Sequence, residues 1–176
     1  MAAGDLPDGL DRAQHVELAH RARQVWGRRA LIAALAAIPV VALMNVFGQQ
    51  DSNTAAVAPA ATLTVRAPDR LRGGLLYQTV FTIVAHRRIE SLDLVLSPGW
   101  LDGLTLNTVE PAASQETSRD GRVSLSYGKL DPGRKVVVFA DWQVNPTTVT
   151  HRGVDADVYD GANLLAHVHR TLTVFP

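Results

Sequence analysis

Two different patterns of hydrophobic and polar residues divide this chain. Residues 30–47, ALIAALAAIPVVALMNVF, carry no charged side chain, and a polar run follows them directly. At a rise of about 1.5 Å per residue, these eighteen residues would span about 27 Å as a helix, close to the hydrocarbon thickness of a bilayer. From residue 62 onward, short runs of β-branched and aromatic residues alternate with polar ones. The pattern therefore predicts one N-terminal transmembrane helix followed by an all-β domain.

The residues on either side of the apolar stretch predict its orientation. A weak apolar stripe at helical spacing predicts that residues 1–29 form a juxtamembrane helix that continues into the span. Arg28 and Arg29 precede the span without a neighbouring acid, whereas the first charge after it is Asp51. Because basic residues favour the cytoplasmic side, we expect a single-pass cell-membrane protein with a cytoplasmic N-terminus and an extracytoplasmic C-terminal domain.

Particular roles are expected for five residues of the membrane segment. Trp26 is a candidate anchor at the membrane interface. Pro39 removes one backbone hydrogen bond and is expected to kink the helix, and Asn45 is the strongly polar side chain of the span. Ala33 and Ala37 lie one turn apart and would allow the helix of a membrane partner to approach closely. Alanine is also abundant throughout this chain, which explains the same spacing without a partner.

Residues 48–61, GQQDSNTAAVAPAA, have no hydrophobic period, and we expect a flexible linker that spans about 20 Å. A cleaved signal peptide is the alternative, because Ala56, Val57 and Ala58 match the small-x-small pattern of a cleavage site. However, a leader of 29 residues precedes the apolar stretch, and Pro59 directly follows the cleavage site. An uncleaved signal anchor is therefore favoured.

Residues 62–176 are predicted to form an antiparallel β-sandwich of immunoglobulin type with about seven strands. The expected strands are 62–66, 75–85, 92–96, 104–109, 122–127, 135–144 and 164–175, with a short eighth at 154–159. Alternation assigns their faces. In the last strand the core face consists of Leu164, Ala166, Val168, Leu172 and Val174.

The turns of this domain carry a resemblance to a known class. The segment 128–134, GKLDPGR, followed by KVVVFADWQV, resembles the Gly-x-Leu-x-Pro-Gly turn that precedes a late strand in bacterial extracytoplasmic immunoglobulin-like domains of the adhesion-repeat type. Pro132 would preset φ, and Gly133 would take the positive φ of a type II turn. The resemblance implies a fold, here in a single copy on one anchor, and a fold does not determine a function.

Composition narrows the classes of function. The 17 basic residues balance 17 acidic ones, so no nucleic-acid partner is expected. The absence of cysteine excludes disulfides, thiolate metal sites and thiol nucleophiles. The sequence has no Gly-x-Ser-x-Gly elbow, no His-Glu-x-x-His motif and no Gly-rich phosphate loop, so we expect neither an enzyme nor a cofactor. Abundant Ala and the excess of Arg over Lys are typical of GC-rich bacterial genomes.

Candidate binding residues remain in the outer domain. His167 and His169 project from one face of the last strand, and with His151 they are weak candidates for a metal site. Exposed histidines on a sheet are common, so no metal is predicted. Trp100, in the loop 97–103, is either an exposed contact for a partner or a plug over one end of the sandwich.

Together these features predict a membrane-anchored accessory or scaffold protein. Its outer domain would bind a partner protein of the membrane or the cell envelope, close to the lipid bilayer. The alternative is an extracytoplasmic binding module for a small ligand, a metal or a cell-envelope glycan, with the loops near Trp100 and His151 as its binding surface.

Overall fold

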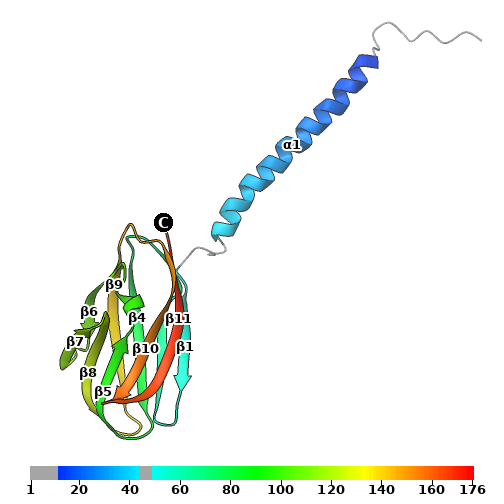
Figure 1. Ribbon diagram of the computed structural model, residues 1–176. Coiled ribbons are helices and arrows are strands. Elements are labelled where there is room, and N and C mark those ends of the chain that lie inside the picture. Colours follow the sequence, from blue (N-terminus) through cyan, green and yellow to red (C-terminus); the bar gives the residue numbers. More distant parts are fainter. Residues whose placement is uncertain (1–11, 44–48) are drawn as a thin grey trace, which may run out of the picture. The chain divides into compact units, whose positions relative to one another are not determined.

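The chain consists of two compact units, Met1–Phe47 and Gly48–Pro176. The computed structural model describes residues 12–43 of the first unit and residues 49–176 of the second (Figure 1). The first unit contains a helix and the second a β-sandwich, so the predicted fold class is confirmed.

Helix α1 runs from Arg12 to Leu43 and continues through Pro39. Within it, Gln24–Val41 is long and apolar enough to cross a membrane, and none of this window is buried. The guanidinium of Arg29 lies 5.8 Å from the ring centroid of Trp26. One continuous helix therefore joins the residues before the apolar stretch to that stretch, as predicted, over residues 12–43, whereas Asn45 lies outside the described residues.

Residues 49–176 form eleven strands in two sheets, compared with the seven or eight that were predicted. The five-stranded sheet has the order β1 (Asp51–Val57), β2 (Ala61–Pro68), β4 (Leu76–Ala85), β9 (Lys135–Val144) and β6 (Leu104–Glu110). The six-stranded sheet has the order β3 (Arg70–Arg72), β11 (Asn163–Phe175), β10 (Thr150–Asp160), β5 (Ile89–Leu96), β8 (Arg122–Leu130) and β7 (Gln115–Arg119). The pairing of β3 with β11 is parallel.

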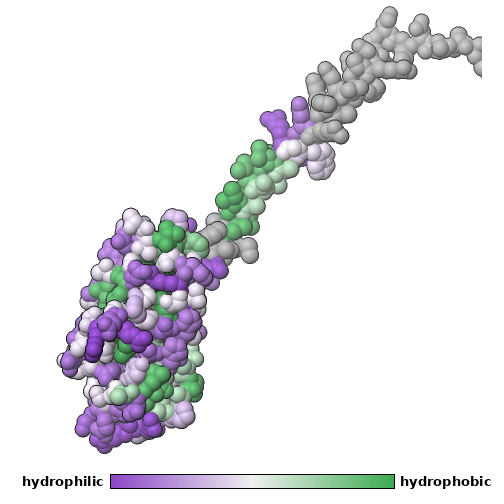
Figure 2. All heavy atoms as spheres, in the orientation of Figure 1, coloured by the Kyte–Doolittle hydropathy of each residue, from purple (hydrophilic) through white to green (hydrophobic). Residues whose placement is uncertain are grey.

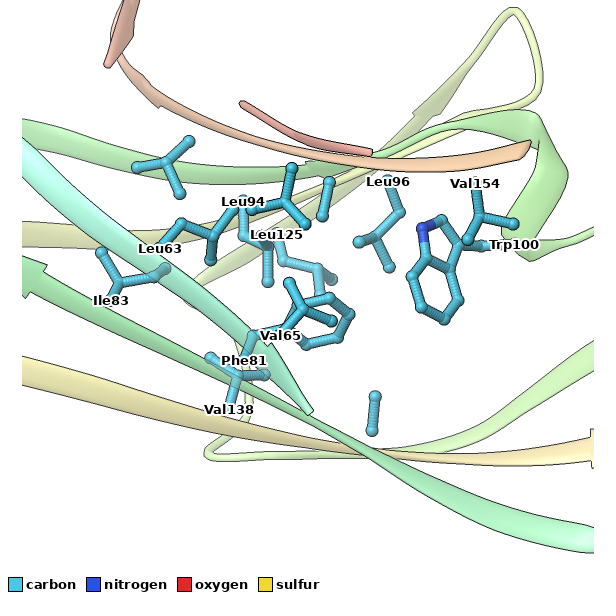
Figure 3. Packing of buried hydrophobic residues seen from close by; sticks show 14 of the residues in the cluster. Leu63, Val65, Phe81, Ile83, Leu94, Leu96, Trp100, Leu125, Val138 and Val154 are labelled. Atoms are coloured by element: carbon cyan, nitrogen blue, oxygen red, sulfur yellow. The ribbon is translucent and has the colours of Figure 1, made fainter. Parts of the chain in front are cut away.

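The core lies between the inner faces of the two sheets, as alternation predicts (Figure 3). Both sheets contribute aliphatic side chains, and the short helix Pro98–Trp100 adds an indole. The residues labelled in Figure 3 are Leu63, Val65, Phe81, Ile83 and Val138 from the five-stranded sheet, Leu94, Leu96, Leu125 and Val154 from the six-stranded sheet, and Trp100.

The last strand departs from the predicted pattern. Leu164 was expected in the core but is 53% exposed, whereas Leu165 is buried. The cause is a register shift, because Val158 pairs with Ala166 and Tyr159 pairs with Leu164. The extra residue in β11 reverses the face to which the first residues of the strand point.

The prediction of a flexible linker over residues 48–61 is wrong. Residues 51–57 form β1, which pairs with β2 along its whole length. Ala60 and Ala61 are buried in the core. Strand β1 shows no hydrophobic alternation because it is an edge strand whose inward side chains, Ser52 and Thr54, contact a buried arginine instead of the apolar core. The sandwich therefore begins about ten residues earlier than the sequence indicated.

The type II turn between β8 and β9 is confirmed. Gly133 has a φ of 75°, and the backbone N–H of Arg134 donates to the carbonyl of Asp131 at 3.1 Å. This geometry sets the register in which β9 enters the centre of its sheet.

Candidate functional site

Arg170 closes one edge of the sandwich, where β11 faces β1 and β2. It occupies a core-facing position of β11 and is 5% exposed. Nη1 donates to the carbonyls of Val65 (2.9 Å) and Ser52 (3.0 Å), and Nη2 donates to the carbonyl of Ala67 (2.7 Å). Further hydrogen bonds join the guanidinium to the hydroxyls of Ser52 and Thr54 and to the carboxylate of Asp69.

These contacts make Arg170 a bridge between the two sheets. A buried guanidinium is tolerated only when its donors and its charge are satisfied, which the carbonyls and Asp69 achieve here. The bridge also holds β1, the strand nearest to α1 in the chain, against the rest of the domain.

A groove of about 550 Å³ lies at the opposite edge, between the two sheets. Strands β6 and β7 are the last strands of their sheets, so each has one edge without a strand partner among residues 49–176. The groove lining is mainly aliphatic and includes Leu104, Leu106, Val109, Ala113, Val123 and Leu125. An apolar groove beside a free strand edge can accept an extended peptide, whose backbone pairs with the edge while alternate side chains enter the groove.

Polar side chains also line this groove, and Glu116 is the charged one among them. Glu116 lies on β7 and shares the lining with the uncharged polar residues Thr105, Asn107 and Thr108. Tyr127, on β8, is not among the lining residues, and its hydroxyl is buried with no hydrogen-bond partner among the described residues. Burial raises the pKa of Tyr127 to about 12, and the carboxylate of Glu116 acts in the same direction. A ligand with a basic group would therefore be favoured near Glu116.

The histidines of the last strands bind carboxylates rather than one another. Nδ1 of His167 lies 2.6 Å from Oδ1 of Asp157, and Nδ1 of His169 lies 2.6 Å from Oδ1 of Asp155. Both pairs lie directly across from each other on β10 and β11. Cross-strand pairs of this kind stabilise a sheet.

The third histidine is separate from these pairs, because Nδ1 of His151 contacts the hydroxyl of Thr173 at 2.9 Å. In the part of the chain that the structure describes, no group of three or more His, Cys, Asp or Glu residues is arranged to hold a metal ion. The candidates His151, His167 and His169 therefore do not converge on one site.

Trp100 is not the exposed partner contact that the sequence left open. Its side chain is 1% exposed and lies between the sheets (Figure 3). The ring stacks on Trp142 with centroids 5.6 Å apart and meets the edge of Phe81 at 5.7 Å. Nε1 donates to the carbonyl of Asp155 at 3.0 Å. Trp100 is therefore buried, as the alternative of a plug over one end of the sandwich required, and it is part of the core.

Neither the bridge made by Arg170 nor the groove at the opposite edge was predicted from the sequence. The signal for Arg170 was a charged residue in the core phase of an otherwise alternating strand. The groove left no such signal, since it depends on which strands lie at the sheet edges. The partner-contact candidates Ala33 and Ala37 lie on α1 and are exposed.

No protein-family model matches the chain, and no curated protein matches its sequence. Solved structures that resemble it include a non-cellulosomal cohesin from the archaeon Archaeoglobus fulgidus, with 15% identity over 60% of this chain and 85% of that chain and a TM-score of 0.39. CaCohA2 from Clostridium acetobutylicum shows 15% identity over 66% and 92% of the two chains, with a TM-score of 0.45. The human F-spondin reeler domain shows 15% identity over 76% and 97%, with a TM-score of 0.39. The function proposed below rests on the residues of this chain alone.

Proposed function

We propose that this chain is a single-pass membrane-anchored accessory or scaffold protein whose extracytoplasmic sandwich binds a partner protein near the bilayer. The observation that carries the proposal is the apolar window Gln24–Val41, which is entirely exposed and is joined by a short connection to a folded β domain. The window exposes large aliphatic side chains, which are costly in water and favourable in lipid: Leu31, Ile32, Leu35, Ile38, Val40 and Val41.

The position of β1 supports an anchor that stays attached. Cleavage after Ala58 would remove β1 from the sandwich. It would also take away the Ser52 carbonyl and the Ser52 and Thr54 hydroxyls that satisfy buried Arg170. Arg28 and Arg29, directly before the uncharged residues 30–47, and Asp51 after them favour a cytoplasmic N-terminus.

The groove between β6 and β8 is the surface that we assign to the partner. Its free strand edges and aliphatic lining suit an extended segment of a protein with small apolar side chains at alternate positions. Glu116 favours a basic side chain in that segment. An integral membrane partner would in addition approach α1 at Ala33 and Ala37.

Three measurements test the anchor and its orientation. The full-length protein is expected to stay in membranes during carbonate extraction, and protease added to spheroplasts is expected to digest the sandwich. N-terminal sequencing of the mature protein should show residues preceding α1. A mature N-terminus near Pro59, or a sandwich protected in intact spheroplasts, would overturn the anchor and its orientation.

The partner is tested by purification in mild detergent followed by mass spectrometry. Wild-type protein is expected to carry a stoichiometric partner. Ala112→Trp would fill the groove from an exposed lining position and should abolish that partner. Ala55→Trp, at an exposed alanine of β1, is the matched control and should retain it. A partner that survives Ala112→Trp would overturn the assignment of the groove.

A further inference from the structure

Two neighbouring loops at one end of the sandwich expose aliphatic side chains. Leu75 and Leu76 follow the Gly73–Gly74 turn, and Val149 lies between β9 and β10; Leu76 and Val149 are each 65% exposed. The loops are adjacent because the backbone N–H of Gly74 donates to the carbonyl of Val144, the last residue of β9. Figure 2 shows hydrophobic residues among polar ones at the end of the sandwich where Figure 1 marks the C-terminus.

The chain enters the sandwich at this same end. Asp51, the first residue of β1, pairs with Pro68. The next residue, Asp69, accepts a hydrogen bond from the backbone N–H of Thr173, near the end of β11. The end that holds the exposed Leu and Val side chains is therefore also the end at which β1 begins.

The length of the connection excludes the opposite end as a membrane contact. Eight Cα steps separate Leu43, the end of α1, from Asp51, and they span at most about 29 Å when fully extended. Strand β10 has 11 residues and is about 36 Å long. If the opposite end rested on the bilayer, Asp51 would lie farther from the membrane surface than this connection can reach.

We propose that the loops 73–76 and 145–149 contact the surface of the lipid bilayer that holds α1, an inference that rests on the anchor proposed above. Leu75, Leu76 and Val149 would enter the interfacial region, where aliphatic side chains leave water. Arg72, exposed on β3 two residues before Gly74, is placed to contact lipid phosphates.

The contact has a consequence for partner binding. With this end on the membrane, the groove between β6 and β8 lies along a side of the sandwich and stays open to a partner in the same membrane. The loops 73–76 and 145–149 would thus orient the sandwich on the membrane, while the groove binds the partner protein.

The absence of cysteine makes a direct test possible. Leu76→Cys and Val57→Cys each introduce one thiol for a fluorophore into the full-length protein, which is then placed in nanodiscs whose lipids carry a nitroxide on the head group. Val57 is the matched control because it is 80% exposed and lies at the opposite end, beside the turn in which Ala58 bonds to Ala61. Quenching is expected to be several-fold stronger at position 76 than at position 57.

A second variant separates the contact from simple proximity. In the protein labelled at position 76, Val149→Ser should reduce the quenching, whereas Val57→Ser should leave it unchanged. If the protein does not co-elute with nanodiscs, the anchor fails and the lipid contact fails with it. If it co-elutes but positions 57 and 76 are quenched equally, the lipid contact alone is overturned and the anchor stands.

Discussion

Replacing Arg170 by alanine should destabilise the sandwich and loosen β1 first. The guanidinium donates to carbonyls of Ser52, Val65 and Ala67 that would then be left without this donor. Breaking a buried, hydrogen-bonded charge pair by removing one partner costs about 3–5 kcal/mol. Asp69 is half exposed and can be solvated again, so the cost arises mainly from the buried carbonyls and the space left by the side chain.

The loss should be measurable by urea unfolding of the full-length protein in detergent, followed by the fluorescence of Trp100 and Trp142. A Trp26→Phe background removes the signal of α1. A loss of about 3–5 kcal/mol corresponds to a fall in Tm of about 10–20 °C for a domain of this size. Hydrogen exchange should accelerate more in β1 than in β9, which lies inside its sheet.

Arg66→Ala is the matched control for Arg170→Ala. Arg66 lies on β2, its side chain is 53% exposed, and its Nε is 3.8 Å from the carboxylate of Asp51. An exposed pair of this kind contributes less than about 1 kcal/mol. Arg170→Lys keeps the charge but not the planar fork and should give an intermediate loss. If Arg170→Ala and Arg66→Ala cost the same, the bridge between the sheets does not stabilise the domain as argued.

Three other substitutions test the core, a buried phenol and a turn. Trp100→Ala should cost about 3–5 kcal/mol in urea unfolding, and Trp100→Phe less; an unchanged midpoint would contradict the burial of the ring. Burial raises the pKa of Tyr127 from 10 to about 12, so this phenol stabilises the fold below pH 10 and the contribution is lost as pH rises toward 12. Tyr127→Phe should therefore flatten the alkaline limb of the stability profile, and an identical limb would refute this assignment. Gly133→Ala places a Cβ at a φ of 75° and should lower the free energy of unfolding by about 1 kcal/mol, measured as a fall in Tm. An unchanged Tm would argue against the type II turn.

Features that depend on local spacing were predicted well. The strand at residues 135–144 matches β9 at both ends, and the turn at Pro132 and Gly133 has the predicted geometry. Both follow from neighbouring residues, because alternation and φ preferences act within a few positions. The apolar window of α1 was recognisable for the same reason.

The strands that were missed all lie at sheet edges. Strand β3 has three residues, β7 is exposed at every position, and β1 has polar residues on its inward side. None of them buries an apolar face, so none shows the hydrophobic period from which strands are predicted. Each of them is held by a neighbouring strand instead: β1 pairs with β2, β7 with β8, and β3 with β11, which is distant in the chain.

The amino-acid pattern alone was enough to establish a charge-free helical span, a β domain without disulfides and most of the strands of that domain, since each depends on residues close together in the chain. Long-range pairing was needed for the rest. It placed Arg170 against carbonyls more than 100 residues away, brought β6 opposite β8 to form the groove, and put Trp100 inside the core. A contact between distant segments is set by strand order and register, and neither of these leaves a periodic signal in one stretch of sequence.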